Sequence, residues 1–352
     1  MKKNLLILLF LVCTLPTLAA KKYASPSGSA SNSGNSLLEA WSLEFALGTS
    51  SPLLPGDSLM MADGTYPGNF ISELYGTAEK PIRIMPLNAG KAIIDAGRNR
   101  SGESGILVKG NYTWFIGIHV TPSSTNRNPD ASNGFAAIEI EAGITVTGDH
   151  NKLINCWIYD VVGGGLQLWR SGLNLEVYGC VVFNNGFQEV PRGYGHGMYI
   201  QHDEVNFPKE IVNNIVFQNA SQGINIYTTN PINRGLIVDK NVSFNTGVFA
   251  DFNPILFRPP HNLSIGSRNN LSSDIVVTGN IFYSDLQGGR LEPSGVSNVT
   301  LGRTFYPNLN FKFTGNKIYG GRNQVELLPA SRLSFTENLL VNTSGQFISV
   351  YE

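Results

Sequence analysis

Seven short segments in the second half of the chain repeat one pattern of polar and apolar positions. Each has Cys or Asn in its third place, apolar residues around it, and an aromatic residue in its sixth place except in the last segment. Consecutive segments are 22 to 39 residues apart, which predicts a coil of 22 to 24 residues carrying insertions of varying length. The segments are 154–159, 178–183, 212–217, 239–244, 278–283, 314–319 and 336–341.

This repeat predicts a solenoid of parallel strands with side chains stacked from coil to coil. Equivalent residues on successive coils lie about 4.8 Å apart in such a fold. The third-place asparagines should satisfy buried turn amides, and the sixth-place aromatic residues should fill the core. Cys156 and Cys180 begin the asparagine row one coil apart, so we expect stacked buried thiols. A disulfide is the lesser alternative, and metal binding is weaker still.

A second strand follows the turn in several coils, and its outward side chains are the first candidates for ligand binding. The strands are 165–169, 197–201, 223–227 and 254–258. Because side chains alternate along a strand, the apolar residues face inward and two rows face outward. The rows are Gln167, Tyr199, Asn225, Leu256 and, beside them, Trp169, Gln201, Tyr227, Arg258. Aromatic faces and amides arranged in this way favour a sugar-binding surface.

Two insertions should add side chains to this surface. The first, from Phe187 to His196, carries Arg192 and Tyr194 and ends in a glycine-rich stretch with His196. The second, residues 257–262, carries His261, and His202 follows the strand that holds Tyr199. Loops on a rigid scaffold commonly carry functional groups. His119 and His150 are interpreted as structural turn residues.

The amino-terminal region predicts a short helix followed by regular strands. Residues 37–47 have apolar residues at helical spacing behind a candidate N-cap at Asn35–Ser36, so this helix should plug one end of the solenoid. A Pro-Gly-Asp turn at 55–57 precedes an alternating strand, and 76–84 and 92–96 repeat that rhythm.

These features, in roughly the first third of the chain, resemble the chondroitinase B and alginate lyase type of polysaccharide lyase. The resemblance rests on the capping helix, the turn at 55–57 and the Gly76-Thr77 to Pro81-Ile82 segment. It implies an all-β fold, a right-handed parallel β-helix with a short amino-terminal capping helix. It also implies an acidic, uronate-containing polysaccharide as substrate. The family's lysine and arginine pair with calcium has no match here, so we expect no metal and no cofactor, with calcium as the open alternative.

Composition and charge limit the remaining classes. Residues 1–20 have the basic, apolar and small-residue layout of a signal peptide, which predicts a secreted or periplasmic protein; acylation at Cys13 is a lesser alternative. Residues 21–352 should form a single β-helix domain of roughly ten to twelve coils. No later segment predicts a membrane span.

The net charge argues against a nucleic-acid partner. Without Lys2 and Lys3 the chain has 23 basic and 26 acidic residues, a net charge of −3, whereas a nucleic-acid binder carries a basic face. Two cysteines in the exported part are too few for a disulfide scaffold. We therefore expect a monomer that binds an acidic polysaccharide, not nucleic acid or a membrane.

A polyuronate lyase needs a group that neutralises the C5 carboxylate, a base for the C5 proton and an acid for the leaving O4 oxygen. We assign Arg258 to the carboxylate, with Arg192 as the alternate, His196 as base and Tyr199 as acid or in both roles. The remaining candidates, all expected to bind substrate, are Trp169, Gln167, Arg192, Tyr194, Gln201, His202, Asn225, Tyr227 and His261. A C5-epimerase, a glycoside hydrolase and a non-catalytic glycan-binding protein stay open as alternatives.

Overall fold

The computed structural model describes most of the chain beyond the expected signal peptide. The described residues are 19–96, 104–123, 142–189, 192–229, 232–247, 261–284, 297–302, 306, 308–321, 323–341 and 346–350. Residues 1–18 of the predicted signal peptide and Arg258 therefore lie outside the described residues.

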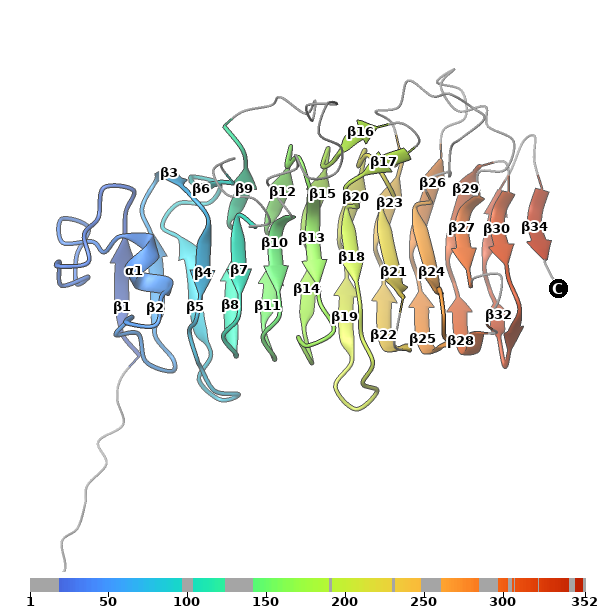
Figure 1. Cartoon of the computed structure of the whole chain (residues 1–352), viewed down its shortest axis with the longest axis horizontal. Helices are drawn as coiled ribbons and strands as arrows, with labels where there is room; N and C mark the ends of the chain where they lie inside the picture. Colours follow the sequence, from blue (N-terminus) through green and yellow to red (C-terminus); the bar gives the residue numbers. More distant parts are fainter. Residues whose placement is uncertain are drawn as a thin grey trace, which may run out of the picture.

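Three parallel sheets run the length of the molecule, and each complete coil adds one strand to each of them (Figure 1). We call them sheets A, B and C. Sheet A contains β1 (Lys21–Ala24), β2 (Ser58–Met61), β5 (Ile82–Pro86), β8 (Thr113–Ile116), β11 (Lys152–Ile154), β14 (Glu176–Tyr178), β19 (Lys209–Val212), β22 (Asn233–Asp239), β25 (Ser272–Thr278), β28 (Asn308–Thr314), β31 (Ala330–Ser331) and β32 (Ser334–Thr336).

Sheets B and C have ten strands each. Sheet B contains β3 (Gly64–Pro67), β6 (Ala92–Asp95), β9 (His119–Thr121), β12 (Trp157–Tyr159), β15 (Val181–Phe183), β20 (Ile215–Phe217), β23 (Val242–Phe244), β26 (Ile281–Ser284), β29 (Lys317–Gly320) and β33 (Leu339–Val341). Sheet C contains β4 (Phe70–Ser72), β7 (Ile106–Val108), β10 (Ala142–Val146), β13 (Gly164–Leu168), β18 (Met198–Ile200), β21 (Ile224–Thr228), β24 (Leu263–Ser267), β27 (Ser297–Leu301), β30 (Asn323–Leu327) and β34 (Gln346–Val350). The predicted parallel β-helix and its coil number are confirmed.

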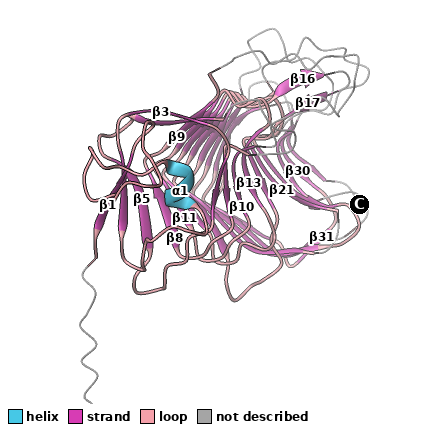
Figure 2. Cartoon of the chain, turned by 60° about the vertical axis from the view of Figure 1, so that its left-hand side comes forward, coloured by secondary structure: helices cyan, strands magenta, loops and turns pink. Residues whose placement is uncertain are grey.

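The three sheets surround the interior of the solenoid (Figure 2). The core in this interior is built from the inward residues of the short strands. In β13 of sheet C, for example, Leu166 and Leu168 are fully buried, while Gln167 between them faces outward. Alternation along strands this short places one or two side chains per strand in the interior. The apolar rows therefore run continuously from coil to coil.

The corner between sheets A and B holds the predicted asparagine ladder. Asn241 is fully buried; its Nδ2 donates to the Ile211 carbonyl oxygen (2.8 Å) and to Asn280 Oδ1 (2.9 Å). Its own Oδ1 accepts from the backbone N–H of Asn214 (2.9 Å). The same exchange repeats toward Asn316 and Asn338. Each asparagine side chain thus satisfies buried backbone groups of the preceding coil, as expected, and donates to the asparagine side chain of the following coil.

The residue before each ladder position makes the corner sharp. These residues adopt positive φ angles between 52° and 66°, the left-handed region in which Gly and Asn are least strained. The set is Asn155, Gly179, Asn213, Lys240, Gly279, Gly315 and Glu337. Five of these seven are Gly or Asn, so the turn geometry explains most of the second place of the sequence repeat.

Cys156 and Cys180 occupy the first rungs of this ladder as free, fully buried thiols. The Cys180 backbone N–H donates to Asn214 Oδ1 (2.8 Å), which joins the cysteine rungs to the asparagine rungs. Burial raises the pKa of the Cys180 thiol well above its usual value. The prediction of stacked buried thiols is confirmed.

The expectation that the sixth-place aromatic row fills the core is wrong. Ile158, Val182 and Val216 point inward from sheet B, so the aromatic residues one place later point outward. There they stack face to face, with ring centroids 5.1, 4.9 and 4.8 Å apart along the row Tyr159, Phe183, Phe217 and Phe244. The row is half-buried and lies on the outer face of sheet B. The spacing within the repeat did not reveal whether the sixth residue faces the core or the outer side of sheet B.

A column of glycines forms the corner between sheets B and C. A Cβ at Gly197 would lie 2.6 Å from Val216 Cγ1 and 2.7 Å from the Gly223 carbonyl oxygen, too close for any other residue without a shift. The column comprises Gly105, Gly143, Gly165, Gly197 and Gly223. The insertion predicted at Phe187–His196 leaves the coil just before this corner and forms an antiparallel hairpin, β16 (Phe187–Glu189) and β17 (Arg192–Tyr194).

The amino-terminal helix is shorter than expected. Helix α1 spans Leu43–Leu47, and its N-cap is Ser42, whose side chain accepts from the Phe45 backbone N–H. The segment before the helix bonds to β1 instead. The Trp41 N–H donates to the Tyr23 carbonyl oxygen, and the Tyr23 N–H donates to the Gly34 carbonyl oxygen. Leu38, inside the predicted helix, is 96% exposed. The helix still buries Leu43 and Leu47 at the first end of the core (Figure 2).

Among the residues that the structure describes, no helix is long and apolar enough to cross a membrane.

The ladder predicts a large effect of a single substitution. Asn241→Ala should lower the free energy of unfolding by about 2 to 4 kcal/mol, because it removes a buried side chain and leaves the Ile211 carbonyl oxygen and the Asn214 N–H of the preceding coil unsatisfied. Urea unfolding followed by circular dichroism measures the change. Asn88→Ala is the matched control, since Asn88 is exposed and bonds to the exposed Asp63, and should shift the midpoint little. Equal effects of the two variants would contradict this role of the ladder.

Candidate functional site

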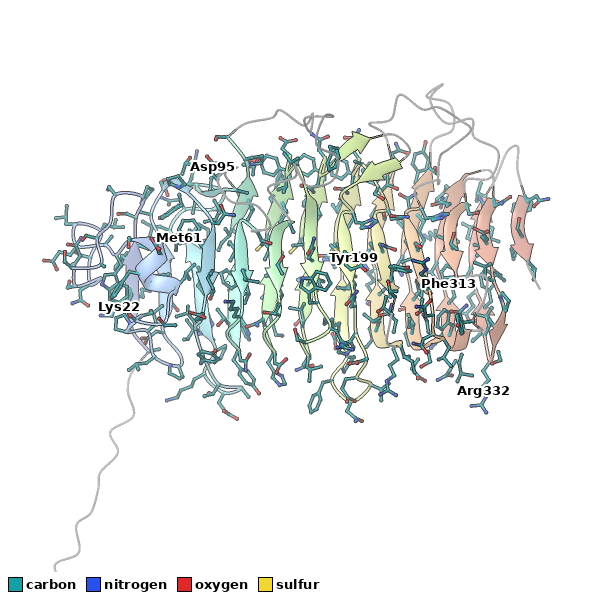
Figure 3. All side chains as sticks on the ribbon, viewed as in Figure 1. Lys22, Met61, Asp95, Tyr199, Phe313 and Arg332 are labelled. Atoms are coloured by element: carbon teal, nitrogen blue, oxygen red, sulfur yellow. The ribbon has the colours of Figure 1, made fainter. Side chains whose placement is uncertain are left out.

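The outward row of sheet C places three predicted site residues side by side. Gln167 pairs with Tyr199, and Tyr199 pairs with Asn225, on the consecutive strands β13, β18 and β21. Tyr199 lies near the middle of the long axis of the molecule (Figure 3). The predicted next strand, 254–258, is wrong, because Leu263–Ser267 pairs with β21 and Ser264 follows Asn225 in the row. The places expected for Leu256 and Arg258 are held by Ser264 and Gly266, which pair with Asn225 and Tyr227.

His196, Tyr199, Gln201 and Asn225 form one connected group. His196 Nε2 and Asn225 Nδ2 are 3.2 Å apart, and the His196 ring stacks on the Tyr199 ring at a centroid distance of 5.6 Å and an interplanar angle of 19°. Gln201 Nε2 donates to the Tyr199 hydroxyl oxygen (3.1 Å). Because Asn225 presents an N–H to Nε2, that imidazole nitrogen is placed as an acceptor.

Two further aromatic residues border this group. The ring centroid of Tyr199 is 5.8 Å from that of Trp169 and 6.5 Å from that of Tyr227, both in edge-on geometry. Asn225 is only 6% exposed, so its amide lies at the bottom of the surface. The result is a polar floor between aromatic side chains, an arrangement suited to pyranose rings and their hydroxyls.

The backbone fixes His196 as firmly as it fixes Tyr199. The His196 carbonyl oxygen accepts from the Gly165 N–H (2.9 Å), one coil earlier, and the next residue, Gly197, donates to the Gln222 carbonyl oxygen (2.9 Å). His196 therefore already belongs to the hydrogen-bonded ladder of sheet C. Only the part of the insertion before it, which includes the hairpin, departs from the coil.

The predicted arginines are not placed at the site by described side chains. Arg192 and Tyr194 belong to β17, whose backbone pairs with β16, and their side chains lie outside what the structure describes. Arg258 lies outside the described residues altogether. The neutralising role assigned to Arg258 and Arg192 stays a prediction.

His202 is not a surface residue, so its predicted part in substrate binding is wrong. Its side chain is fully buried, and Nε2 lies 2.9 Å from the Phe207 carbonyl oxygen. Burial, with a smaller contribution from Lys209, lowers the pKa of His202 to about 4. His202 lies two residues after the end of β18, on the segment that leads to β19 of sheet A.

Lys209 is a buried cation that the sequence reasoning missed. Its side chain is fully buried, and its Nζ donates to the carbonyl oxygens of Trp169 and Gln201, the latter at 2.7 Å. Burial lowers the pKa of Lys209 to about 7. Only its position in the sequence indicates that Lys209 is buried: it stands two residues before the inward Ile211 on the same strand and so faces the same side. Lys209 thus bonds to the residues that directly follow β13 and β18, which are Trp169 and Gln201.

His261 lies on the same face of sheet C but at a distance from His196. The Gly223 N–H donates to the His261 carbonyl oxygen (2.9 Å), which sets His261 two coils after His196 in the column through Gln222. Its Nδ1 lies 2.6 Å from the Ser297 carbonyl oxygen and 3.1 Å from Thr300 Oγ1. His261 thus joins another polar group.

The remaining histidines, His119 and His150, are structural, although not both in the way expected. His150 stacks on Tyr112 in a turn, whereas His119 lies within strand β9 and stacks on Trp157. Asp203 is partly exposed, forms a β-bridge with Arg234 and lies 3.6 Å from Arg170 Nη1.

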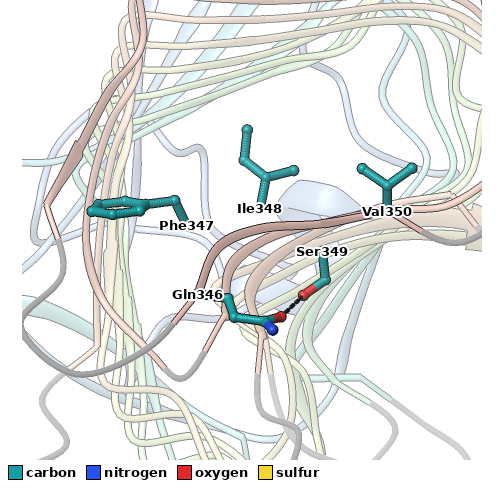
Figure 4. A pocket seen from close by; sticks show the side chains of 5 residues that line it. All are labelled: Gln346, Phe347, Ile348, Ser349 and Val350. Atoms are coloured by element: carbon teal, nitrogen blue, oxygen red, sulfur yellow. Dashed lines mark hydrogen bonds between the residues drawn. The ribbon is translucent and has the colours of Figure 1, made fainter.

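Within the described residues, no group of three or more His, Cys, Asp or Glu side chains could hold a metal ion. A recess of about 760 Å³ lies at the carboxy-terminal end of the solenoid, on β34, and is lined by Gln346, Phe347, Ile348, Ser349 and Val350 (Figure 4). Its lining contains no ionisable side chain, so it offers no acid or base. The group around Tyr199 is the better candidate for chemistry.

Comparisons with known proteins agree with this fold. The model of the right-handed beta helix region matches residues 87–249. Pectate lyase L of Dickeya chrysanthemi is 28% identical over 175 residues, which are 46% of this chain and 37% of that protein. The match therefore spans well under half of the relative's length.

Two solved structures extend the likeness over nearly the whole chain. Pectate lyase Pel9A has a TM-score of 0.58 at 17% identity, covering 91% of this chain and 78% of the other. An alginate lyase from Paenibacillus sp. str. FPU-7 has a TM-score of 0.60 at 19% identity, covering 95% and 99%. The chain is a right-handed parallel β-helix. It resembles the polysaccharide lyases built on that fold.

Burial of His202 predicts acid sensitivity. Its pKa is about 4 in the folded protein and 6.5 when unperturbed, so between these values the unfolded chain binds more protons and acid favours unfolding. Lowering the pH from 6.5 to 4 should cost on the order of 2 kcal/mol at this residue. His202→Gln should flatten that part of the pH dependence, measured by urea unfolding across the range.

His150→Gln is the control, because His150 lies in a partly exposed turn. A pH profile of His202→Gln as steep as that of the unchanged protein would contradict the role of the buried imidazole.

Proposed function

We propose that the chain is a polysaccharide lyase that cleaves an acidic, uronate-containing polysaccharide by β-elimination. The observation that carries the proposal is the connected group of His196, Tyr199, Gln201 and Asn225 on the outer face of sheet C. It supplies an imidazole bonded to one amide, Asn225, and a phenol bonded to another, Gln201, with the two rings stacked on each other. These are the group types that proton removal beside a carboxylate requires.

In the proposed reaction, His196 Nε2 gives up its hydrogen bond from the Asn225 amide and accepts the C5 proton of the uronate. Electrons of the C5–H bond form the C4–C5 double bond, and the C4–O4 bond breaks. Tyr199 donates its hydroxyl proton to the departing O4 oxygen, and the Gln201 N–H stabilises the phenolate that remains. In the alternative assignment Tyr199 performs both transfers.

Negative charge develops on the uronate carboxylate during proton removal and must be stabilised. Asn225 and Gln167 flank Tyr199 and offer amide N–H groups on the same row. Arg258 or Arg192 is proposed to add the positive charge. The proposal includes no metal, so a chelator should leave the rate unchanged.

A glycoside hydrolase is less well supported. An inverting hydrolase needs two carboxylates about 6.5 to 9.5 Å apart. Among the described residues of the outward row that contains Tyr199, the sole carboxylate is Glu326, on β30. A C5-epimerase shares the proton removal and differs in returning a proton to C5, so product analysis separates it from a lyase.

The likeness to pectate and alginate lyases supports this reaction class and an acidic sugar. The proposed setting is outside the cytoplasm, after removal of residues 1–20.

Incubating the protein with pectate, alginate and glycosaminoglycans should produce unsaturated chain ends, followed by ultraviolet absorbance. His196→Ala and Tyr199→Phe should each lower the rate about 10² to 10⁴-fold, because each removes a proton-transfer group. Tyr178→Phe is the matched control: Tyr178 lies on sheet A, 40% exposed, and should keep full activity.

Other products would point elsewhere. New reducing ends without absorbance would indicate hydrolysis, and solvent deuterium at C5 without cleavage would indicate epimerisation. Full activity of both site variants would show that the chemistry lies at another place.

A further inference from the structure

A second polar group lies on sheet C, on the strands β24, β27 and β30 and the residues just before them. Its centre is the carboxylate of Glu326. Glu326 Oε2 accepts hydrogen bonds from Ser297 Oγ and from Thr300 Oγ1, both at 3.1 Å. Thr300 Oγ1 also lies 3.1 Å from His261 Nδ1, which itself contacts the Ser297 carbonyl oxygen.

This hydrogen bonding fixes the carboxylate on the outer face. Ser297 is fully buried and Thr300 is 7% exposed, so the two hydroxyls form a rigid base beneath Glu326, which is itself partly exposed. Glu326 forms no ion pair with a described residue. A carboxylate held in this way presents an acceptor, and a negative charge, to whatever lies over the sheet.

Glu326 and Tyr199 belong to the same outward row. The row runs from Tyr199 through Asn225, Ser264 and Thr300 to Glu326, one residue per coil. With strands about 4.8 Å apart, four coils separate the two side chains by roughly 19 Å. A polysaccharide that follows the row from Tyr199 would therefore place a ring several sugars away over Glu326.

We infer that Glu326, with Ser297, Thr300 and His261, forms a subsite for an uncharged sugar ring and excludes a uronate from that place. The inference rests on the proposed function, because it takes sheet C as the substrate face. A neutral ring donates its hydroxyls to the carboxylate, whereas a uronate brings a second negative charge against it. The favoured substrate is thus a mixed polymer in which uronates are interspersed with neutral sugars.

Binding experiments test this without catalysis. Calorimetry in the Tyr199→Phe background would compare hexasaccharides made only of galacturonate with hexasaccharides alternating galacturonate and a neutral hexose. The alternating chain should bind at least tenfold more tightly. Adding Glu326→Gln should raise the affinity for the all-uronate chain about tenfold or more, and added salt should shrink that gain, since it screens the repulsion.

Glu210→Gln is the matched control. It removes the same charge from β19 on sheet A and should change neither affinity. Thermal unfolding checks that Glu326→Gln still folds, as expected because glutamine keeps an acceptor for the two hydroxyls.

The inference is overturned if both hexasaccharides bind equally, if neither binds, or if Glu326→Gln leaves the all-uronate affinity unchanged. Failure of the lyase proposal is distinguishable from these results. Selective binding of the alternating chain without any unsaturated product from the unsubstituted protein would retain the subsite and reject the lyase.

Discussion

The hydrogen-bond exchange at the corner between sheets A and B is the constraint on which the fold depends. A parallel coil must turn sharply there, and the turn buries backbone groups that no strand can satisfy. On the preceding coil, a backbone carbonyl oxygen and a backbone N–H are satisfied by the side chain of each of four asparagines, Asn214, Asn241, Asn280 and Asn316. Because these bonds fix the register of consecutive coils, the rows on every other face follow from them, including the row through Tyr199.

Much of the architecture could be predicted because ladders leave a direct mark on the sequence. Identical side chains stack, so Asn in the third place of successive repeats revealed the corner, and alternation around Leu166, Ile200 and Ile226 revealed the inner face of sheet C. The pattern did not reveal where the aromatic row points. Aromatic residues can stack on one another on the inner or on the outer face of a sheet. Which face they occupy depends on whether the residue before each of them points into the core.

The site was predictable to the extent that it lies on regular strands. Gln167, Tyr199 and Asn225 came together because one strand period governs them all. The strand expected at 254–258 was wrong, since Leu263–Ser267 fills that place and an insertion of variable length hides the register. Lys209 and His202 were missed as buried groups because a polar residue in an inward place looks, in sequence, like a break in the pattern.

The chain's extra length is concentrated at one corner, and this has a consequence for how such a protein can change. The hairpin β16–β17 leaves the coil just before the glycine column, while the asparagine corner keeps the same short turn throughout. New loops can therefore be grafted beside sheet C without altering the register of the solenoid. The scaffold separates the part that evolution or an engineer can lengthen from the part that must repeat.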